Sequence, residues 1–152
     1  MIYLDTSVAL AHLLAEDRVP PDELWGNTVV SSRLLEYELW TRLHARSLAK
    51  SHGDAARALV ARVALLELAP TVLARALDLF PVPVRTLDAI HLASADFLRA
   101  QRQPVALASY DDRMLEAAEH LGIPIWPPCA RTALPRPPPA RRNPAGPKKK
   151  NK

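Results

Sequence analysis

The first fifteen residues, MIYLDTSVALAHLLA, place an acidic residue between two kinds of regular structure. Residues 1–5 are short and mostly apolar, which favours a buried strand, and a helical pattern starts directly afterwards and covers residues 6–15. Asp5 therefore ends a predicted strand and precedes a predicted helix. The same order recurs further along the chain, where PVALAS (residues 104–109) predicts a buried strand and residues 111–121 predict a helix ended by Gly122.

The sequence between these two units continues the alternation of strands and helices. Residues 27–31 contain three successive β-branched side chains, which favour a strand, and Ser31 or Ser32 is expected to cap the helix that follows. Thr86 is expected to cap a later helix. The predicted helices cover residues 33–49, 54–66, 71–80 and 86–102, and the other predicted strands cover residues 66–69 and 123–126. Short strands that alternate with helices predict an α/β fold with a parallel sheet of four or five strands flanked by helices.

The charged residues divide the chain into two parts. The whole chain of 152 residues has a formal net charge of +4, but all 16 acidic residues lie at or before Glu119. Residues 1–128 therefore carry a net charge of −4, and residues 129–152 carry +8 together with six prolines. We expect one domain over residues 1–128 and a disordered, Pro-rich basic tail over residues 129–152, since the tail has few apolar side chains to bury. The tail is either a salt-sensitive contact for nucleic acid or a solubilising extension.

Several classes of protein are excluded by composition. A single cysteine allows no disulfide within the chain and suits a reducing compartment, so we expect a cytoplasmic protein. No apolar run approaches the roughly 18 residues of a membrane-spanning helix, and an acid at position 5 leaves no room for a signal peptide. The four glycines lie far apart, which excludes a glycine-rich phosphate loop and a dinucleotide-binding fingerprint.

Four acidic residues are candidates for a shared site. Asp5 and Asp111 follow predicted strands, and the carboxyl ends of parallel strands are where open sheets form their sites. Glu38 and Asp88 lie on predicted helices among apolar neighbours, where an uncompensated carboxylate is costly. A shared divalent cation would compensate them. Each acid also has a structural interpretation: Asp5 and Asp111 as helix caps, Asp88 as a favourable charge at a helix N-terminus, and Glu38 as a partner of Arg42.

Four blocks of the sequence resemble the conserved blocks of the PIN domain family, and in particular the VapC-type toxin ribonucleases. The blocks are LDTS (residues 4–7), SRLLEYEL (32–39), LDAIHLASA (87–95) and SYD (109–111). The resemblance covers residues 1–128 and implies a three-layer PIN-like fold. Transferred by position, it implies metal binding and catalysis by Asp5, Glu38, Asp88 and Asp111, with Thr6 and Ser109 in support. Asp112, adjacent to Asp111, remains the alternative for the fourth acid.

A cluster of carboxylates without histidine or cysteine ligands suits Mg²⁺ or Mn²⁺. The resemblance implies an endoribonuclease that leaves a 5′-phosphate and a 3′-hydroxyl, a cognate antitoxin as protein partner, and a homodimer. RNA phosphates flanking the site would be held by arginines near its rim: Arg33, Arg42, Arg46 and Arg85. Each of these arginines also has a structural interpretation, as an ordinary solvated side chain. His91 is expected to be a core histidine.

Two other functions compete with this interpretation. The first is a PIN-like module that binds RNA or protein without cleaving, which the presence of all four acids disfavours. The second is a phosphatase or receiver domain, also α/β with acids at strand ends. A phosphatase needs a second aspartate at position 7, where this chain has serine, and residues 106–109 lack the lysine of a receiver.

Overall fold

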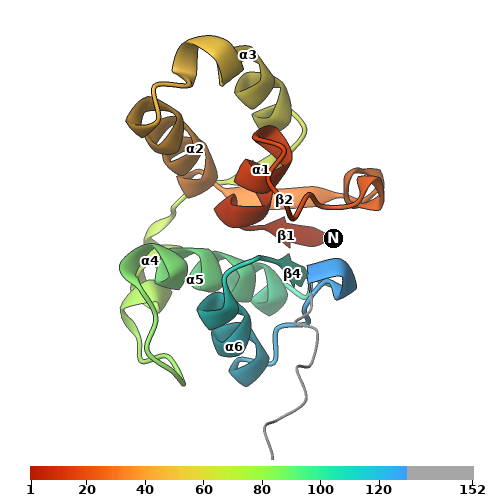
Figure 1. Cartoon of the computed structure of the whole chain (residues 1–152). Helices are drawn as coiled ribbons and strands as arrows, with labels where there is room; N and C mark the ends of the chain where they lie inside the picture. Colours follow the sequence, from red (N-terminus) through yellow and green to blue (C-terminus); the bar gives the residue numbers. More distant parts are fainter. Residues whose placement is uncertain (130–152) are drawn as a thin grey trace, which may run out of the picture.

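A computed structural model describes residues 1–129, which form a four-stranded parallel sheet between two layers of helices (Figure 1). The strand order is β3-β2-β1-β4, so β1 and β4, which are the first and last strands along the chain within residues 1–129, lie side by side. The strands are β1 (Ile2–Leu4), β2 (Val29–Ser32), β3 (Ala64–Leu66) and β4 (Ala106–Ala108). The expected α/β fold with a parallel sheet is therefore confirmed.

The helices divide into two groups by the face of the sheet that they cover. Figure 1 shows α1, α2 and α3 on one side of the sheet and α4, α5 and α6 on the other. The helices are α1 (Thr6–Leu13), α2 (Leu34–Ala45), α3 (Ala49–Val60), α4 (Pro70–Leu77), α5 (Thr86–Ala100) and α6 (Asp112–His120), with short 3₁₀ turns at Asp22–Gly26 and Pro127–Cys129.

Two hydrophobic cores lie on the two faces of the sheet. Successive side chains of a strand point to opposite faces. In β1, Ile2 and Leu4 accordingly pack in one core with Leu35 of α2, while Tyr3 packs in the other with Leu92 of α5. This alternation places the end of β1 between the two helical layers, where Asp5 follows.

The connection between α2 and α3 differs from the prediction. The helix predicted over residues 33–49 ends at Ala45, because Ser47 adopts a positive φ of 57°. The helix predicted to begin at residue 54 begins at Ala49, so Gly53 lies inside α3. A Cβ at Gly53 would come 3.3 Å from the ring of Trp40, so glycine allows α3 to pack closely against α2. Tertiary packing, not chain flexibility, explains this glycine.

The predicted caps and the later strands also need correction. Ser31 donates its hydroxyl to the carbonyl of Leu4 (2.7 Å) and Ser32 makes no cap, so neither serine caps α2, which Arg33 precedes. Thr86 is the first residue of α5 rather than its cap. The third strand lies at Ala64–Leu66 instead of residues 66–69. The fifth strand predicted over residues 123–126 is reduced to one bridge between Ile125 and Leu107.

The packed part of the chain reaches Cys129, one residue beyond the predicted domain boundary. Cys129 is fully buried and belongs to the same core as Leu24 and Trp126. The rest of the predicted tail, residues 130–152, lies outside the described residues. No helix within residues 1–129 is long and apolar enough to cross a membrane.

Candidate active site

Asp5 is held at the carboxyl end of β1 by hydroxyl groups from two elements. Its side chain is buried, and Oδ2 accepts hydrogen bonds from the hydroxyls of Ser7 (2.5 Å) and Ser109 (2.8 Å). Asp5 is also the N-cap of α1, since Oδ2 accepts from the Ser7 backbone N–H (3.3 Å). The interpretation of Asp5 as a helix cap is thus correct, and the cap fixes the carboxylate between the end of β1 and the start of α1.

Asp111 reaches the same edge of the sheet through the turn after β4. The hydroxyl of Ser109 accepts from the Asp111 N–H (3.0 Å), and the hydroxyl of Ser7 accepts from the Tyr110 N–H (2.9 Å). Asp111 caps α6, with Oδ1 accepting from two backbone N–H groups of its first turn, and Oδ2 lies 3.3 Å from Nη1 of Arg85. Asp112 is exposed on the first turn of α6.

Glu38 projects from α2 and is held by side chains of α1 and α5. Its Oε2 accepts hydrogen bonds from the hydroxyl of Thr6 and from Nε2 of His91, the latter at 2.8 Å. Burial alone would raise the pKa of Glu38, but the hydrogen bonds from His91 and Thr6 outweigh it and lower that pKa. Arg42, its predicted partner, contributes only through its charge.

His91 is a core residue that also touches the acidic site. Its side chain is 1% exposed, as expected for a core histidine, yet its ring lies between Tyr3 and Glu38. Burial by itself lowers the pKa of His91, and the interactions with Tyr3, Glu38 and Asp5 outweigh burial and raise the pKa to about 10. Its position one turn after Asp88 was the only sequence signal for this contact.

Asp88 lies in the first turn of α5, where the charge and the backbone of Arg85 compensate its carboxylate only in part. Its Oδ2 is buried and has no hydrogen-bond partner among the described residues. Burial, followed by the charges of Asp111 and Asp5, raises the pKa of Asp88. The carboxylates of Asp5 and Asp111 therefore each lie near enough to repel that of Asp88.

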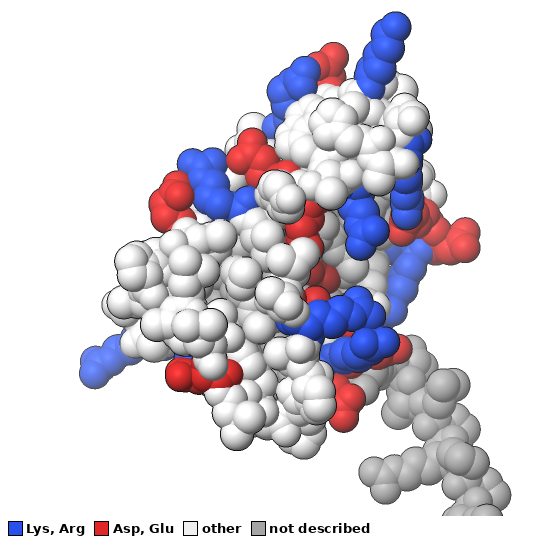
Figure 2. Space-filling view, turned by 90° about the vertical axis from the view of Figure 1, so that its left-hand side faces the viewer, with Lys and Arg blue, Asp and Glu red and all other residues white. Residues whose placement is uncertain are grey.

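Glu38 and Asp88 line a cleft of about 820 Å³ that has both acidic and basic side chains in its walls. Figure 2 shows acidic side chains along a hollow in the surface, with basic side chains around it. Three of the four arginines predicted near the site line this cleft: Arg42, Arg46 and Arg85. The other residues that line it are Thr6, Ser7, Leu10, Ala11, Glu16, Asp17, Arg18, Glu38, Asp88 and Tyr110.

The structure does not bring Arg33 to the cleft, and it adds Arg18. Arg33 pairs on the surface with Glu67 (2.9 Å) and Glu36 (3.4 Å). The Arg18 guanidinium lies 4.3 Å from the centre of the Tyr110 ring. Arg18 comes from an irregular segment after α1, so no local pattern predicted its position.

The donor set suits a hard divalent cation, although it is not gathered around one point. Within residues 1–129, no three His, Cys, Asp or Glu side chains converge closely enough to hold a metal ion. The buried Oδ2 of Asp88 nevertheless accepts no hydrogen bond within residues 1–129, and the charges of Asp5 and Asp111 act on it. Carboxylate oxygens are the ligands that Mg²⁺ and Mn²⁺ take in proteins. The residues present therefore fit such an ion.

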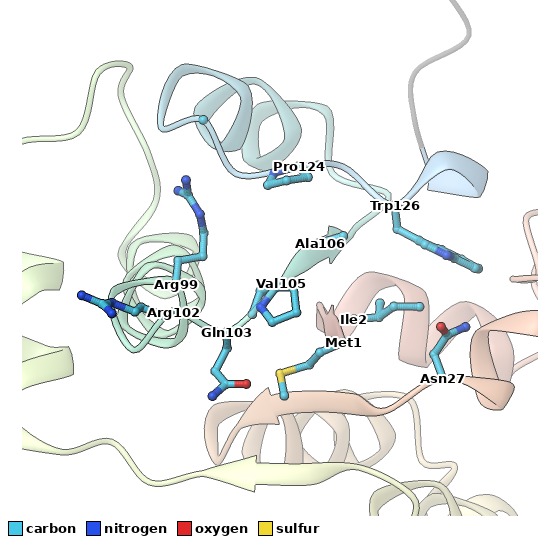
Figure 3. Close-up of a pocket in the computed structure, with 12 residues that line it drawn as sticks. Met1, Ile2, Asn27, Arg99, Arg102, Gln103, Val105, Ala106, Pro124 and Trp126 are labelled. Carbon is cyan, nitrogen blue, oxygen red and sulfur yellow. The ribbon is translucent and has the colours of Figure 1, made fainter.

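A second pocket, of about 620 Å³, lies at the opposite edge of the sheet, where β1 and β4 begin (Figure 3). Arg99, Arg102 and Trp126 are among its lining residues, and none of the lining residues is acidic. Because this pocket has no carboxylate, it lacks the donors of a metal-dependent hydrolytic site. The candidate acids lie instead at the carboxyl ends of the strands.

Comparison with known proteins identifies the family of the chain. The family model described as PIN domain matches residues 2–120. Ribonuclease VapC47 of Mycobacterium tuberculosis is 32% identical over 130 residues, which cover 81% of this chain and 93% of the relative. Ribonuclease VapC46 of the same species is 35% identical over 130 residues, covering 84% and 97%. Ribonuclease VapC35 is 34% identical over 134 residues, also covering 84% and 97%. No solved structure matches the chain.

Proposed function

The chain belongs to the PIN domain family, and on this premise we propose that it is a divalent-metal-dependent endoribonuclease, the toxin of a toxin–antitoxin pair. The observation that carries the proposal is the unpartnered, buried Oδ2 of Asp88 beside Asp5 and Asp111, at a cleft bordered by arginines. The relatives from Mycobacterium tuberculosis that match most of the chain are named as ribonucleases, which supports RNA as the substrate.

Asp5, Glu38, Asp88 and Asp111 would hold Mg²⁺ or Mn²⁺. A bound divalent cation would supply a water of lowered pKa and positive charge for the transition state. Thr6 and Ser109 support the site by donating their hydroxyls to Glu38 and Asp5, which fixes the directions of those carboxylates. Asp111 is favoured over Asp112 as the fourth acid, because its charge acts on Asp88 while Asp112 is exposed.

The reaction would be hydrolysis of a phosphodiester bond of RNA. Water adds to phosphorus, the bond to the 3′ oxygen breaks, and the products carry a 3′-hydroxyl and a 5′-phosphate. The arginines of the cleft would bind phosphates that flank the cleaved bond, which offsets the repulsion between RNA and the acids. Arg42, Arg46 and Arg85 suit this role because they border the cleft.

The resemblance to VapC-type toxins further suggests a cognate antitoxin, a homodimer and a cytoplasmic location, where RNA is accessible. An antitoxin is expected to be a small protein encoded beside this one and to co-purify with it. Size-exclusion chromatography with light scattering tests the homodimer, and a monomer at micromolar concentration would refute it.

The decisive experiment incubates the purified protein with total RNA in the presence of Mg²⁺ or Mn²⁺, and then with EDTA. We expect cleavage that chelation abolishes, with 5′-phosphate ends detected by direct ligation of an adaptor. Asp5→Asn and Asp88→Asn should abolish cleavage in protein that still folds, and Asp112→Asn is the matched control that should retain it. Cleavage by Asp5→Asn or Asp88→Asn would refute the site, and RNA binding without cleavage by the wild type would establish the binding-only alternative.

A further inference from the structure

His91 joins three elements of the fold at a point beneath the cleft. Its ring is buried on α5, its Nδ1 lies 3.0 Å from the hydroxyl of Tyr3 in β1, and its Nε2 lies 2.8 Å from Oε2 of Glu38 in α2. The rings of Tyr3 and His91 meet edge to face, with an interplanar angle of 78°. The hydroxyl of Tyr3 also accepts the backbone N–H of Ser32 in β2 (3.2 Å). A chain of polar contacts thus connects the sheet to Glu38.

The chemistry of these groups fixes the direction of the last contact. An ionised carboxylate only accepts hydrogen bonds, so Nε2 of His91 carries a hydrogen and donates it to Glu38. The contact between Nδ1 and Tyr3 is compatible with either protonation state of the ring, because a hydroxyl both donates and accepts. Since the Tyr3 ring is fully buried and its oxygen is held by the sheet, the imidazole has a fixed anchor on the side away from Glu38.

We infer that His91, anchored by Tyr3, is a positioning residue that orients the Glu38 carboxylate at the cleft. Together with Thr6 it occupies Oε2, and it leaves Oε1, which has no hydrogen-bond partner among residues 1–129, available to a ligand. The inference rests on the proposed function for the role of Glu38 as a metal ligand. Glu38 is the only one of the four proposed ligands on α2. Its orientation depends on hydrogen bonds from Thr6 of α1 and His91 of α5.

The competing interpretation is that His91 only fills space in the core. Leu92 and Ala95 of the same helix are fully buried and apolar, and a leucine at position 91 would fill a similar volume. His91→Leu therefore keeps the packing and removes both polar contacts. His91→Gln keeps an N–H donor near the position of Nε2, and Tyr3→Phe removes the anchor together with the acceptor of the Ser32 N–H. Leu92→Ala is the matched control, because it weakens the same helix without touching the chain of contacts.

The experiment measures Mn²⁺ affinity by calorimetry and steady-state RNA cleavage for the full chain and these four variants. Loss of a group that orients a metal ligand typically weakens metal affinity by about 10- to 100-fold. We expect that loss in His91→Leu, with a lower kcat and an unchanged KM for RNA. His91→Gln should recover most of the affinity, and Tyr3→Phe should lie between the two. Leu92→Ala should bind Mn²⁺ like the wild type while melting at a lower temperature.

A signal that needs neither metal nor substrate separates the two proposals. In the metal-free protein, the Nε2–H of His91 should give a slowly exchanging NMR resonance that shifts in Glu38→Gln. If this resonance is present but the wild type neither binds Mn²⁺ nor cleaves RNA, the proposed function fails and the positioning contact stands. If wild-type protein binds and cleaves while His91→Leu matches it in Mn²⁺ affinity and kcat, the positioning role is refuted and the proposed function stands. Absence of the resonance in folded wild-type protein would also refute the positioning role.

Discussion

Replacing Asp88 with asparagine should change the stability of the protein in opposite directions with and without a divalent cation. The pKa of Asp88 is raised, so the folded state holds this proton more tightly than the unfolded state does. Stability is therefore lost as the pH rises from the unfolded pKa through the folded one, and the ionised Asp88 destabilises the protein at neutral pH. Asparagine has nearly the same shape without the charge. In the absence of metal, Asp88→Asn should be as stable as the wild type or more stable, by up to about 1 kcal/mol.

With a divalent cation bound, the wild type should be more stable than Asp88→Asn. A ligand at 100 times its dissociation constant stabilises the folded state by about 2.7 kcal/mol, which for a domain of this size raises the melting temperature by roughly 8 °C. If removal of the Asp88 carboxylate weakens binding about 100-fold, the same Mn²⁺ concentration stabilises the variant by only about 0.4 kcal/mol, or roughly 1 °C. The wild type should thus gain several degrees from Mn²⁺, and the variant almost none.

Differential scanning fluorimetry in EDTA and in MnCl₂ measures the melting temperature without metal and the shift that Mn²⁺ causes. Asp112→Asn is the control, because Asp112 is exposed and lies next to the proposed ligand Asp111. It should show the full wild-type gain from Mn²⁺. An undiminished Mn²⁺ shift in Asp88→Asn would show that Asp88 is not a ligand. A large loss of stability in EDTA would show that its charge is compensated in the folded protein.

Three further predictions concern other parts of the chain. Since the pKa of His91 is raised from 6.5 to about 10, the metal-free wild type should lose stability as the pH rises through that range, while His91→Leu should not. Urea titrations at several pH values in this range measure the free energy of unfolding, and an equal decline in the wild type and His91→Leu would refute the prediction. Replacing both Arg42 and Arg46 with alanine should weaken RNA binding without changing Mn²⁺ affinity. The slope of log K against log salt concentration should become less steep by about one unit per lost phosphate contact. Fluorescence anisotropy with a non-cleavable RNA at several salt concentrations measures the affinity and the slope. Deleting residues 130–152 should weaken RNA binding at low salt and leave the cleavage sites unchanged, and mapped sites that shift would contradict this.

The alternation of strands and helices was predictable because it depends on periodic burial, which each segment carries in its own sequence. The position of Gly53 inside a helix was not, because it depends on a contact between α2 and α3. Gly53 has the local signature of a helix break, yet it lies inside α3 because the Trp40 ring needs the space. The serines before α2 failed as caps for a similar reason, since the hydroxyl of Ser31 is used by β1. At each of these positions, tertiary contacts rather than local propensity determine the observed structure.

The acids of the candidate site could be named from four short blocks, but their supporting contacts could not. Ser7 lies within the first block, and only the fold reveals that its hydroxyl ties Asp5 to the turn after β4. His91 lies one turn from Asp88, but its partner is Glu38, 53 positions earlier in the chain. Arg18 has no local pattern at all. Contacts between distant segments are set by packing, and a single sequence does not display them.

The four acids differ in how the protein alone compensates them, and this difference indicates where metal binding would change most. Asp5 is bonded by two hydroxyls, Glu38 by Thr6 and His91, and Asp111 by the N-terminus of α6. Asp88 has a buried oxygen with no partner. An unsatisfied buried group costs about 1–3 kcal/mol, and a cation that satisfied it would recover that cost in addition to its attraction for the other carboxylates. Of the proposed ligands, Asp88 should therefore be the one whose loss reduces metal affinity more than the loss of Glu38 or Asp111.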